Sequence, residues 1–326
     1  MEVSEIVLIF AVMRITPNKI NTMKSWRLCG LIVLSVVLSL SMTACGDDEE
    51  EGPKTSQDNN NENTIKEPPT PRSIVVNVDA NGKASGGHSF SKIDDSNFLV
   101  DGVKYEVVSS NMLFVRGFDP ETIKEAVEII STLNYGGRSY STYAIENKAF
   151  YECQKMTSVM IPDGLNQIHQ GAFNNCPNLA AVAIPSSVQN ISEQAFISCR
   201  SLLNVVINSN WIAQKKFIYR MFGYQVQKFT FAETIERLGD SAFEQCGTMT
   251  TLVMKSTGVL YLGNSSLSQC SSLKHIYLYV TTPPTYGSAF ENTDISKIQV
   301  HVPESAVEAF CASDYWMYFN RIVAIK

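Results

Sequence analysis

The spacing of the cysteines constrains the fold of this chain most strongly. Cys153, Cys176 and Cys199 lie 23 residues apart, and Cys246 and Cys270 lie 24 residues apart. Apolar residues recur with the same period. The residues three positions before these cysteines are Phe150, Phe173, Phe196, Phe243 and Leu267. Self-similarity at a fixed period of this length is the signature of a repeat architecture, so the spacing predicts a solenoid.

Each period ends in two apolar residues separated by one position. These pairs begin at positions 159, 182, 205, 229, 252, 276 and 298, which makes seven units in register. Gly223 takes the cysteine slot of the fourth unit, and Asn292 takes that of the seventh. The alternation predicts a short strand with one buried face. One unit cannot bury its own apolar side, whereas stacked units can.

One full unit reads IHQGAFNNCPNLAAVAIPSSVQN, residues 168–190. This unit resembles the leucine-rich repeat class, and more closely its BspA-like subclass, over about residues 140–302. The resemblance implies a β-rich α/β solenoid, a right-handed leucine-rich repeat superhelix of about seven units of 22–24 residues. The fourth unit departs from the pattern, because Arg220, Met221 and Phe222 replace its Ala-Phe pair.

A solenoid needs caps at both ends, because its terminal strands would otherwise present open edges. Residues 73–139 predict a β-rich N-terminal cap, with strand-like alternation at 74–78, 98–108 and 112–115. Residues 120–133 fit a helix, whereas the segment 128–140 resembles the strand-and-turn lead-in of this family. Residues 303–326 predict a C-terminal cap, with a short helix after Pro303 and the aromatic residues Tyr315, Trp316 and Phe319 packed as a lid. The alternative is that these aromatic residues form a platform for a sugar.

Residues 1–44 have the order of a bacterial signal peptide. Lys24 and Arg27 follow Met23, and an apolar run from 28 to 40 leads to small residues. This order suggests that Met23 is the true start. The apolar run is shorter than the roughly 20 residues that a transmembrane helix needs. The segment Ser41–Cys45 resembles a lipobox, which implies a lipid anchor on Cys45; the alternative is an ordinary cysteine near a cleavage site.

Residues 45–72 predict a lipidated acidic tether. Residues 46–72 hold eight acidic and three basic side chains and few large apolar ones. Such a segment repels itself and cannot bury a core. Its acidic start resembles a surface-export signal of lipoproteins from Gram-negative anaerobes, which implies an outer membrane lipoprotein exposed at the cell surface. The alternative is a plain solvated linker.

The sequence gives no sign of catalysis, a cofactor or a metal. The four histidines, His88, His169, His275 and His301, carry no partner signature, and neither a phosphate-binding glycine loop nor C-x-x-C occurs. We therefore predict that the chain is not an enzyme. A formal net charge of −6 provides no basic field for phosphate backbones, which argues against nucleic acid as a partner.

The repeat cysteines predict a reduced structural ladder in the core. The five residues are Cys153, Cys176, Cys199, Cys246 and Cys270. Stacked rungs lie about 4.8 Å apart with parallel side-chain directions, which suits packing better than bridging. Disulfides and a metal ladder are the alternatives, and fewer than about four reactive thiols in unfolded protein would contradict the prediction.

The outer face of the predicted sheet, which points away from the interior, is the candidate binding surface. Its central row holds Met160, Ala183, Val206, Thr230, Val253, Tyr277 and Gln299. The candidate ligand residues are Lys228, Thr230, Lys274, His275, Tyr277, Lys297 and Gln299. An apolar half and a cationic half predict binding of an acidic protein or glycan outside the cell. The alternatives are a solvated face and an accessory envelope lipoprotein without an external ligand.

Overall fold

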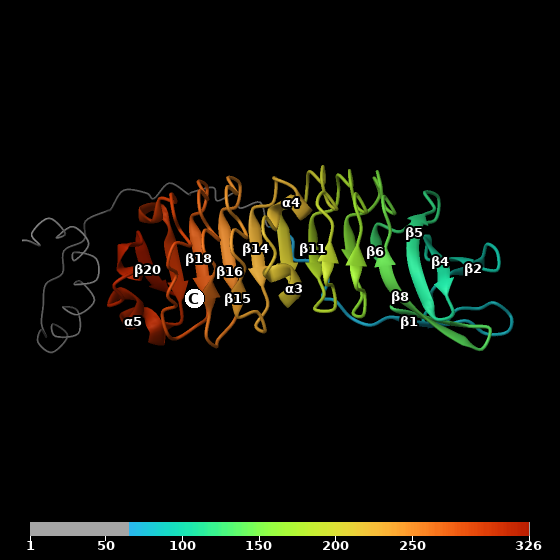
Figure 1. The fold of residues 1–326 in the computed structure, drawn as a ribbon. Coiled ribbons are helices and arrows are strands. Elements are labelled where there is room, and N and C mark those ends of the chain that lie inside the picture. The colour runs from blue at the N-terminus through green and yellow to red at the C-terminus, as the bar shows by residue number, and fades with distance from the viewer. Residues whose placement is uncertain (1–64, 326) are drawn as a thin grey trace, which may run out of the picture. The chain divides into compact units, whose positions relative to one another are not determined.

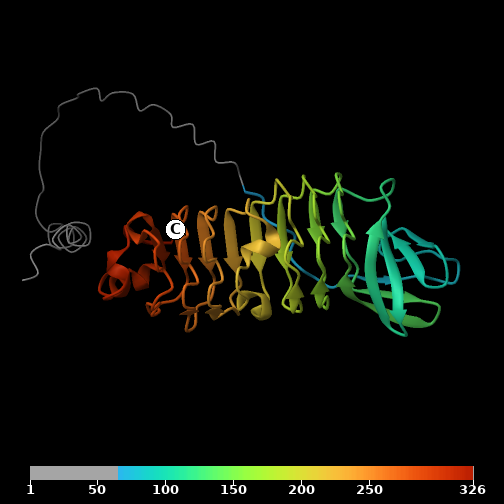
Figure 2. The same cartoon turned by 45° about the horizontal axis from the view of Figure 1, so that its top comes forward.

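The computed structural model describes residues 65–325. The signal segment, Cys45 and the acidic part of the tether lie outside the described residues. Figures 1 and 2 show the described part as a row of stacked coils in which strands dominate. The predicted leucine-rich repeat solenoid is confirmed.

One parallel sheet runs through the repeats. Its strands in order are β11 (Ala181–Ile184), β13 (Asn204–Ile207), β14 (Lys228–Phe231), β16 (Thr251–Met254), β18 (His275–Leu278), β19 (Gln299–Val302) and β20 (Arg321–Ala324). From the second to the sixth unit, the first apolar residue of each predicted pair aligns with the next, as in Val182 with Val205 and Val205 with Phe229. The strand β9 (Ser158–Met160) precedes β11 and pairs with β6 (Ala126–Glu128).

Two-residue strands lie between the main strands along the chain. They are β10 (Gln167–Ile168), β12 (Asn190–Ile191), β15 (Arg237–Leu238) and β17 (Tyr261–Leu262). β10 pairs in parallel with β12, and β15 pairs with β17. Each coil is therefore a main strand, a turn and a shorter extended segment.

The interior is a stack of phenylalanine rings. The ring centroids of Phe150 and Phe173 lie 5.1 Å apart, and those of Phe173 and Phe196 lie 4.7 Å apart, with nearly parallel planes. Three repeat cysteines donate to a carbonyl of the preceding rung: Cys176 Sγ lies 3.1 Å from Phe150 O, Cys199 Sγ lies 3.0 Å from Phe173 O, and Cys270 Sγ lies 3.2 Å from Phe243 O. The A-F-x-x-C segment thus supplies both the packing and the polar contact between rungs.

The N-terminal cap is a mixed sheet that merges with the solenoid. Its strands are β1 (Val75–Asn77), β2 (Phe90–Lys92), β3 (Asn97–Val100), β4 (Val103–Ser109), β5 (Met112–Phe118), β7 (Thr132–Tyr135) and β8 (Arg138–Ile145). β8 pairs in parallel with both β5 and β10, which joins the cap to the repeats. Residues 120–133 contain β6 and the start of β7, so the helical alternative is wrong for this segment.

The C-terminal cap closes the other end of the sheet. The short helices η3 (Glu304–Ala306) and α5 (Val307–Cys311) follow Pro303, and η4 (Trp316–Tyr318) precedes β20. Trp316 is fully buried, and its indole nitrogen donates to Pro284 O at 2.6 Å. Phe319 is buried beside it, while Tyr315 is half exposed.

The fourth unit is extended by two short helices, α3 (Asn210–Ala213) and α4 (Tyr219–Phe222). Phe222 stacks on Phe196 at 5.3 Å, so the ring stack continues although the Ala-Phe pair is missing. Gly223 ends α4 with φ of 98°, a backbone conformation that other residues rarely adopt.

The predicted register of the seventh unit is wrong by two residues. Ile276 aligns with Val300, so the buried pair of β19 is Val300 and Val302. The cysteine slot belongs to Thr293 rather than Asn292: Thr293 Oγ1 donates to Leu267 O at 2.6 Å, as the repeat cysteines donate to their own preceding rungs. The turn η2 (Ile295–Lys297) and the buried Ile298 precede the strand, and Ile298 imitates the first member of an apolar pair.

Candidate functional site

The outer face of the main sheet divides into two halves with different exposure. The covered half comprises β9, β11, β13 and β14, where the outward-pointing Met160, Ala183 and Thr230 are only 2%, 3% and 4% exposed, although Val206 of β13 is partly exposed. β16 lies between the two halves, and its outward-pointing Val253 is 8% exposed. The open half comprises β18 and β19, where the outward-pointing side chains are partly exposed. Side chains on a bare sheet face are solvated, so a further segment must lie over the covered half.

That segment is residues 65–72, which we call the strap. Asn204 Nδ2 on β13 donates to Lys66 O at 3.1 Å, and Lys228 Nζ on β14 lies 2.7 Å from Glu67 Oε1. At its other end, Asp163 N donates to Arg72 O at 3.4 Å. Figures 1 and 2 both show this stretch running from the middle of the solenoid to its N-terminal end.

The ion pair holds the strap electrostatically. Partial burial would raise the pKa of the Glu67 carboxyl, but the hydrogen bond and charge of Lys228 outweigh burial and hold that pKa below its usual value. The Glu67 side chain is 64% exposed, so the pair itself contributes little to stability. Its geometry still places the acidic residue over β14.

The open half brings two histidines and a tyrosine together. His275 Nδ1 and His301 Nε2 lie 3.2 Å apart, and the rings of Tyr277 and His301 stack with centroids 4.0 Å apart. Burial lowers the pKa of His275, with a smaller contribution from the charge of Lys274. Burial followed by the neighbouring His275 lowers the pKa of His301. Both imidazoles are therefore neutral at pH 7 and present flat rings with polar edges.

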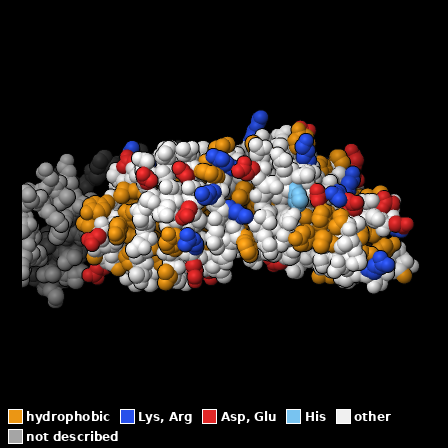
Figure 3. Space-filling model, in the orientation of Figure 1, with side chains coloured by type: hydrophobic (Ala, Val, Ile, Leu, Met, Phe, Trp, Pro, Cys, Tyr) orange, Lys and Arg blue, Asp and Glu red, His pale blue; other side chains and the backbone are white. Residues whose placement is uncertain are grey.

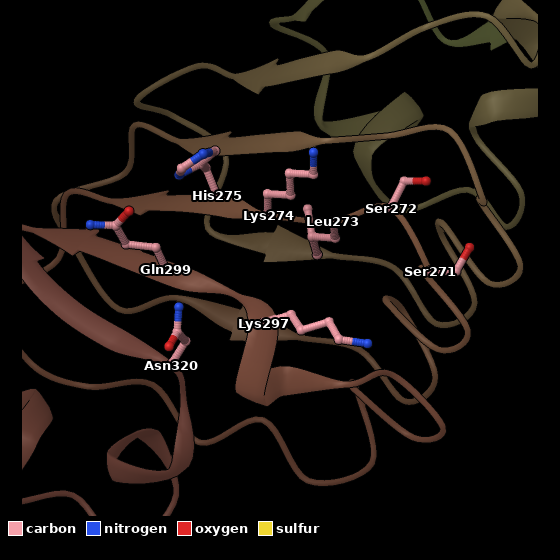
Figure 4. Close-up of a pocket in the computed structure, with 8 residues that line it drawn as sticks. All are labelled: Ser271, Ser272, Leu273, Lys274, His275, Lys297, Gln299 and Asn320. Carbon is pink, nitrogen blue, oxygen red and sulfur yellow. The ribbon is translucent and has the colours of Figure 1, made fainter. Parts of the chain in front are cut away.

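A shallow hollow of about 320 Å³ adjoins these rings (Figure 4). Its lining residues are Ser271, Ser272, Leu273, Lys274, His275, Lys297, Gln299 and Asn320. Lys297 Nζ pairs with Asp294 at 2.9 Å, whereas Lys274 has no ion pair within residues 65–325. The hollow thus combines a cationic side with amide and hydroxyl groups that can donate or accept hydrogen bonds.

The predicted ligand residues separate between the two halves. Lys228 is paired to the strap, and Thr230 is buried with no hydrogen-bond partner for its hydroxyl among the described residues. The other five gather around the open half: Lys274, His275, Tyr277, Lys297 and Gln299. His301 joins them without having been predicted, because Tyr277 aligns with His301 and Gln299 aligns with His275. A step of 24 from position 276 would have revealed this alignment in the sequence.

The five repeat cysteines are buried and form no disulfide in the structure. Burial raises the pKa of Cys153, Cys246 and Cys270, which keeps these thiols protonated and unreactive at neutral pH. Among residues 65–325, no group of three or more His, Cys, Asp and Glu side chains is placed to hold a metal ion. Thiol counting in unfolded protein remains the test of the reduced ladder.

The surface carries charges of both signs. On the face shown in Figure 3, basic, acidic and apolar side chains are interspersed. In the part of the chain that is described, no helix is long and apolar enough to cross a membrane.

The sequence matches the family model described as BspA type leucine rich repeat region, in six copies over residues 138–223 and 218–314. Similar solved structures include leucine-rich repeat proteins from Bacteroides ovatus, with 18% identity over 70% of this chain and 76% of that chain and a TM-score of 0.38, and from Bacteroides capillosus, with 19% identity over 49% and 99% and a TM-score of 0.29. A leucine-rich repeat protein of T. pallidum has 17% identity over 54% and 69% and a TM-score of 0.31. No curated protein matches the chain significantly.

Proposed function

Because the chain belongs to the BspA-type leucine-rich repeat family, we propose that it is a cell-surface lipoprotein that binds a protein or glycan ligand through the open half of its outer face. Leucine-rich repeat proteins in general are binding or scaffold proteins rather than enzymes, and BspA-type members are typically surface-associated. The open half is the part of the outer face that the strap leaves accessible.

The observation that carries the binding proposal is the convergence of charge and flat rings in one place. Lys274 and Lys297 flank the hollow, and Tyr277 and His301 present stacked rings beside it. Flat rings offer contact area at low entropic cost, and the lysines attract carboxylates or sulfates. The ligand that fits is an acidic protein surface or an acidic glycan.

A charge-reversal series tests this surface. The double variant Lys274→Glu/Lys297→Glu should weaken binding to matrix proteins, glycans or whole cells about tenfold or more, which corresponds to about 1.4 kcal/mol. Lys83→Glu, in an exposed turn of the N-terminal cap, makes the matched control for a change of charge. Lys228→Glu should have a smaller direct effect, because Lys228 faces the strap. Unchanged binding of the double variant removes the open half from consideration.

The lipid anchor and the surface location rest on residues outside the described part. Acyl chains on Cys45 would hold the protein on a membrane, since each buried CH₂ contributes about 0.8 kcal/mol. Protease treatment of intact cells that carry a C-terminal tag tests the location, with Cys45→Ala as the control for anchoring. Loss of the tag from intact cells supports the surface lipoprotein. Survival of the tag until the envelope is broken contradicts the adhesion role and favours a periplasmic scaffold.

A further inference from the structure

The strap crosses the sheet where the outward-pointing side chains are small. Ala181 and Ala183 are the outward-pointing residues of β11, and both are 3% exposed. The strap meets β13 and β14 at residues 66 and 67 and leaves the sheet near Asp163 at residue 72, so residues 68–71 must pass over β11. Alanines at this crossing leave room for a backbone that larger side chains would exclude.

The strap has the composition of an extended recognition peptide. Its sequence from Glu67 to Arg72 is EPPTPR, and Pro68, Pro69 and Pro71 are all half-buried. Proline fixes its own φ and keeps the preceding residue out of the helical region, so such a segment is extended before it docks and loses little entropy on binding. Recognition of preformed extended proline-rich segments is a recurrent binding mode.

The sheet contributes specific polar contacts to this segment as well as a fitting shape. Asn204 is fully buried and donates from Nδ2 to a backbone carbonyl of the strap. This contact recognises the path of the strap backbone and does not depend on a strap side chain. Lys228 pairs with Glu67 and therefore recognises the acidic residue that precedes the prolines. These two side chains lie on adjacent strands at aligned positions.

We propose that the covered half is a docking groove for an extended proline-rich peptide that carries an acidic residue before its prolines, and that the strap is its occupant in cis. A partner with such a segment takes the place of the strap. The groove is a second binding surface beyond the proposed function, because the open half does not take part in it. Tethering gives the strap a high effective concentration, about millimolar for short linkers, so a free peptide competes poorly against an intact strap.

A labelled peptide of residues 64–73, TIKEPPTPRS, tests the proposal on the full chain. A released chain carries Glu67→Lys with Pro68→Gly, Pro69→Gly and Pro71→Gly, which removes the acidic and proline features from its own strap. The released chain should bind the labelled peptide at least about tenfold more tightly than the unchanged chain does. The same peptide with Glu67→Lys should bind the released chain about threefold more weakly, because the ion pair is largely exposed. Ala183→Tyr in the released chain should abolish binding by occupying the path of the strap.

The NMR signal of the Asn204 side-chain amide, which donates to Lys66 O, reports docking of the strap during the titration. An Asn204 signal typical of a solvated amide in the unchanged chain, with equal binding of both peptides or with no binding, overturns the proposal. So does an Asn204 signal that is the same in the released chain as in the unchanged chain, because docking would then not depend on the sequence of the strap. Dimerisation of the released chain without binding of the free peptide also overturns it.

A swap of the two charges between the chain and the peptide tests the ion pair in a chain whose strap is not substituted. Its result therefore does not depend on the folding of the released chain. Lys228→Glu in an otherwise unchanged chain should prefer the Glu67→Lys peptide over the original peptide, reversing the order seen with Lys228. An unreversed preference overturns the role of the ion pair. Binding of external ligands by Lys274 and Lys297 is measured separately, so failure of the groove leaves the proposed function standing.

Discussion

The covered and open halves of the outer face share one sheet but present different side chains. Over β11 the outward positions are Ala181 and Ala183, whereas the corresponding positions on β18 are His275 and Tyr277. The alanines of β11 leave room for the strap, whereas the rings of His275 and Tyr277 occupy the corresponding space over β18. Beneath both halves the interior keeps the same apolar pairs. The repeat therefore constrains the inward side chains and leaves the outward ones free to specialise.

The largest expected effect tests whether the interior is equivalent beneath both halves. Phe173→Ala, under the covered half, and Phe243→Ala, in the rung of β16 next to the open half, should each lower the free energy of unfolding by about 3–5 kcal/mol. Both rings are fully buried and contact rings of neighbouring rungs. Urea unfolding followed by circular dichroism measures the loss. If Phe243→Ala lowered the free energy of unfolding and Phe173→Ala did not, the strap rather than the ring stack would determine stability in the covered half.

The next effect separates the two halves directly. Ala183→Lys places a charge beneath the strap and should lower the free energy of unfolding by about 1–3 kcal/mol, because the charge must be desolvated or the strap must leave. Gln299→Lys, at a partly exposed position of the open half, should change it by no more than about 0.5 kcal/mol.

The NMR signal of the Asn204 side-chain amide, which donates to Lys66 O, shows which route the protein takes in the Ala183→Lys variant. A shift of this signal to its position in the released chain would mean that the strap leaves. Equal stability changes in the two lysine variants would contradict the distinction between a covered and an open half.

The repeat could be predicted from sequence because inward positions obey a period. Cysteine and phenylalanine recur at that period, so six of the seven predicted repeat strands, β9, β11, β13, β14, β16 and β18, follow from spacing alone. The seventh register could not be obtained in this way, because Ile298 is buried just before β19 and resembles a strand residue. Two misplaced positions were enough to hide the contact between His275 and His301.

The strap could not be predicted from sequence for a different reason. The segment is polar and proline-rich, which is also the composition of a solvated linker, and residues 65–72 continue the acidic tether. Its docking depends on Ala183, Asn204 and Lys228, which lie more than 100 residues away and carry no periodic signal. Long-range contacts between a linker and a surface leave no local pattern.

A buried hydroxyl gives a smaller effect, confined to the covered half. Thr230 is 4% exposed, and its hydroxyl has no hydrogen-bond partner among residues 65–325. Thr230→Val keeps the shape and removes the unpaired polar group, so it should raise the free energy of unfolding by about 1 kcal/mol. Thermal or urea unfolding measures the change. A loss of stability would show that the hydroxyl is solvated, and hence that the strap does not seal this position.

The smallest expected effect uses pH to address the two halves separately. The pKa values of His275 and His301 are lowered in the folded protein, so the unfolded chain binds more protons as the pH falls from 7 through about 6.5. Stability is therefore full above that range and declines as the pH falls toward the folded pKa values.

The Glu67 pKa is also lowered, so its contribution is present above the unfolded value of about 4.3 and is lost below it. Urea unfolding between pH 8 and 3 should show the first decline in the unchanged chain and a flatter curve in His275→Gln/His301→Gln. The NMR signal of the Asn204 side-chain amide, which donates to the strap, should shift only in the lower window. A shift of that signal together with the histidine titration would mean that the two halves are coupled rather than independent.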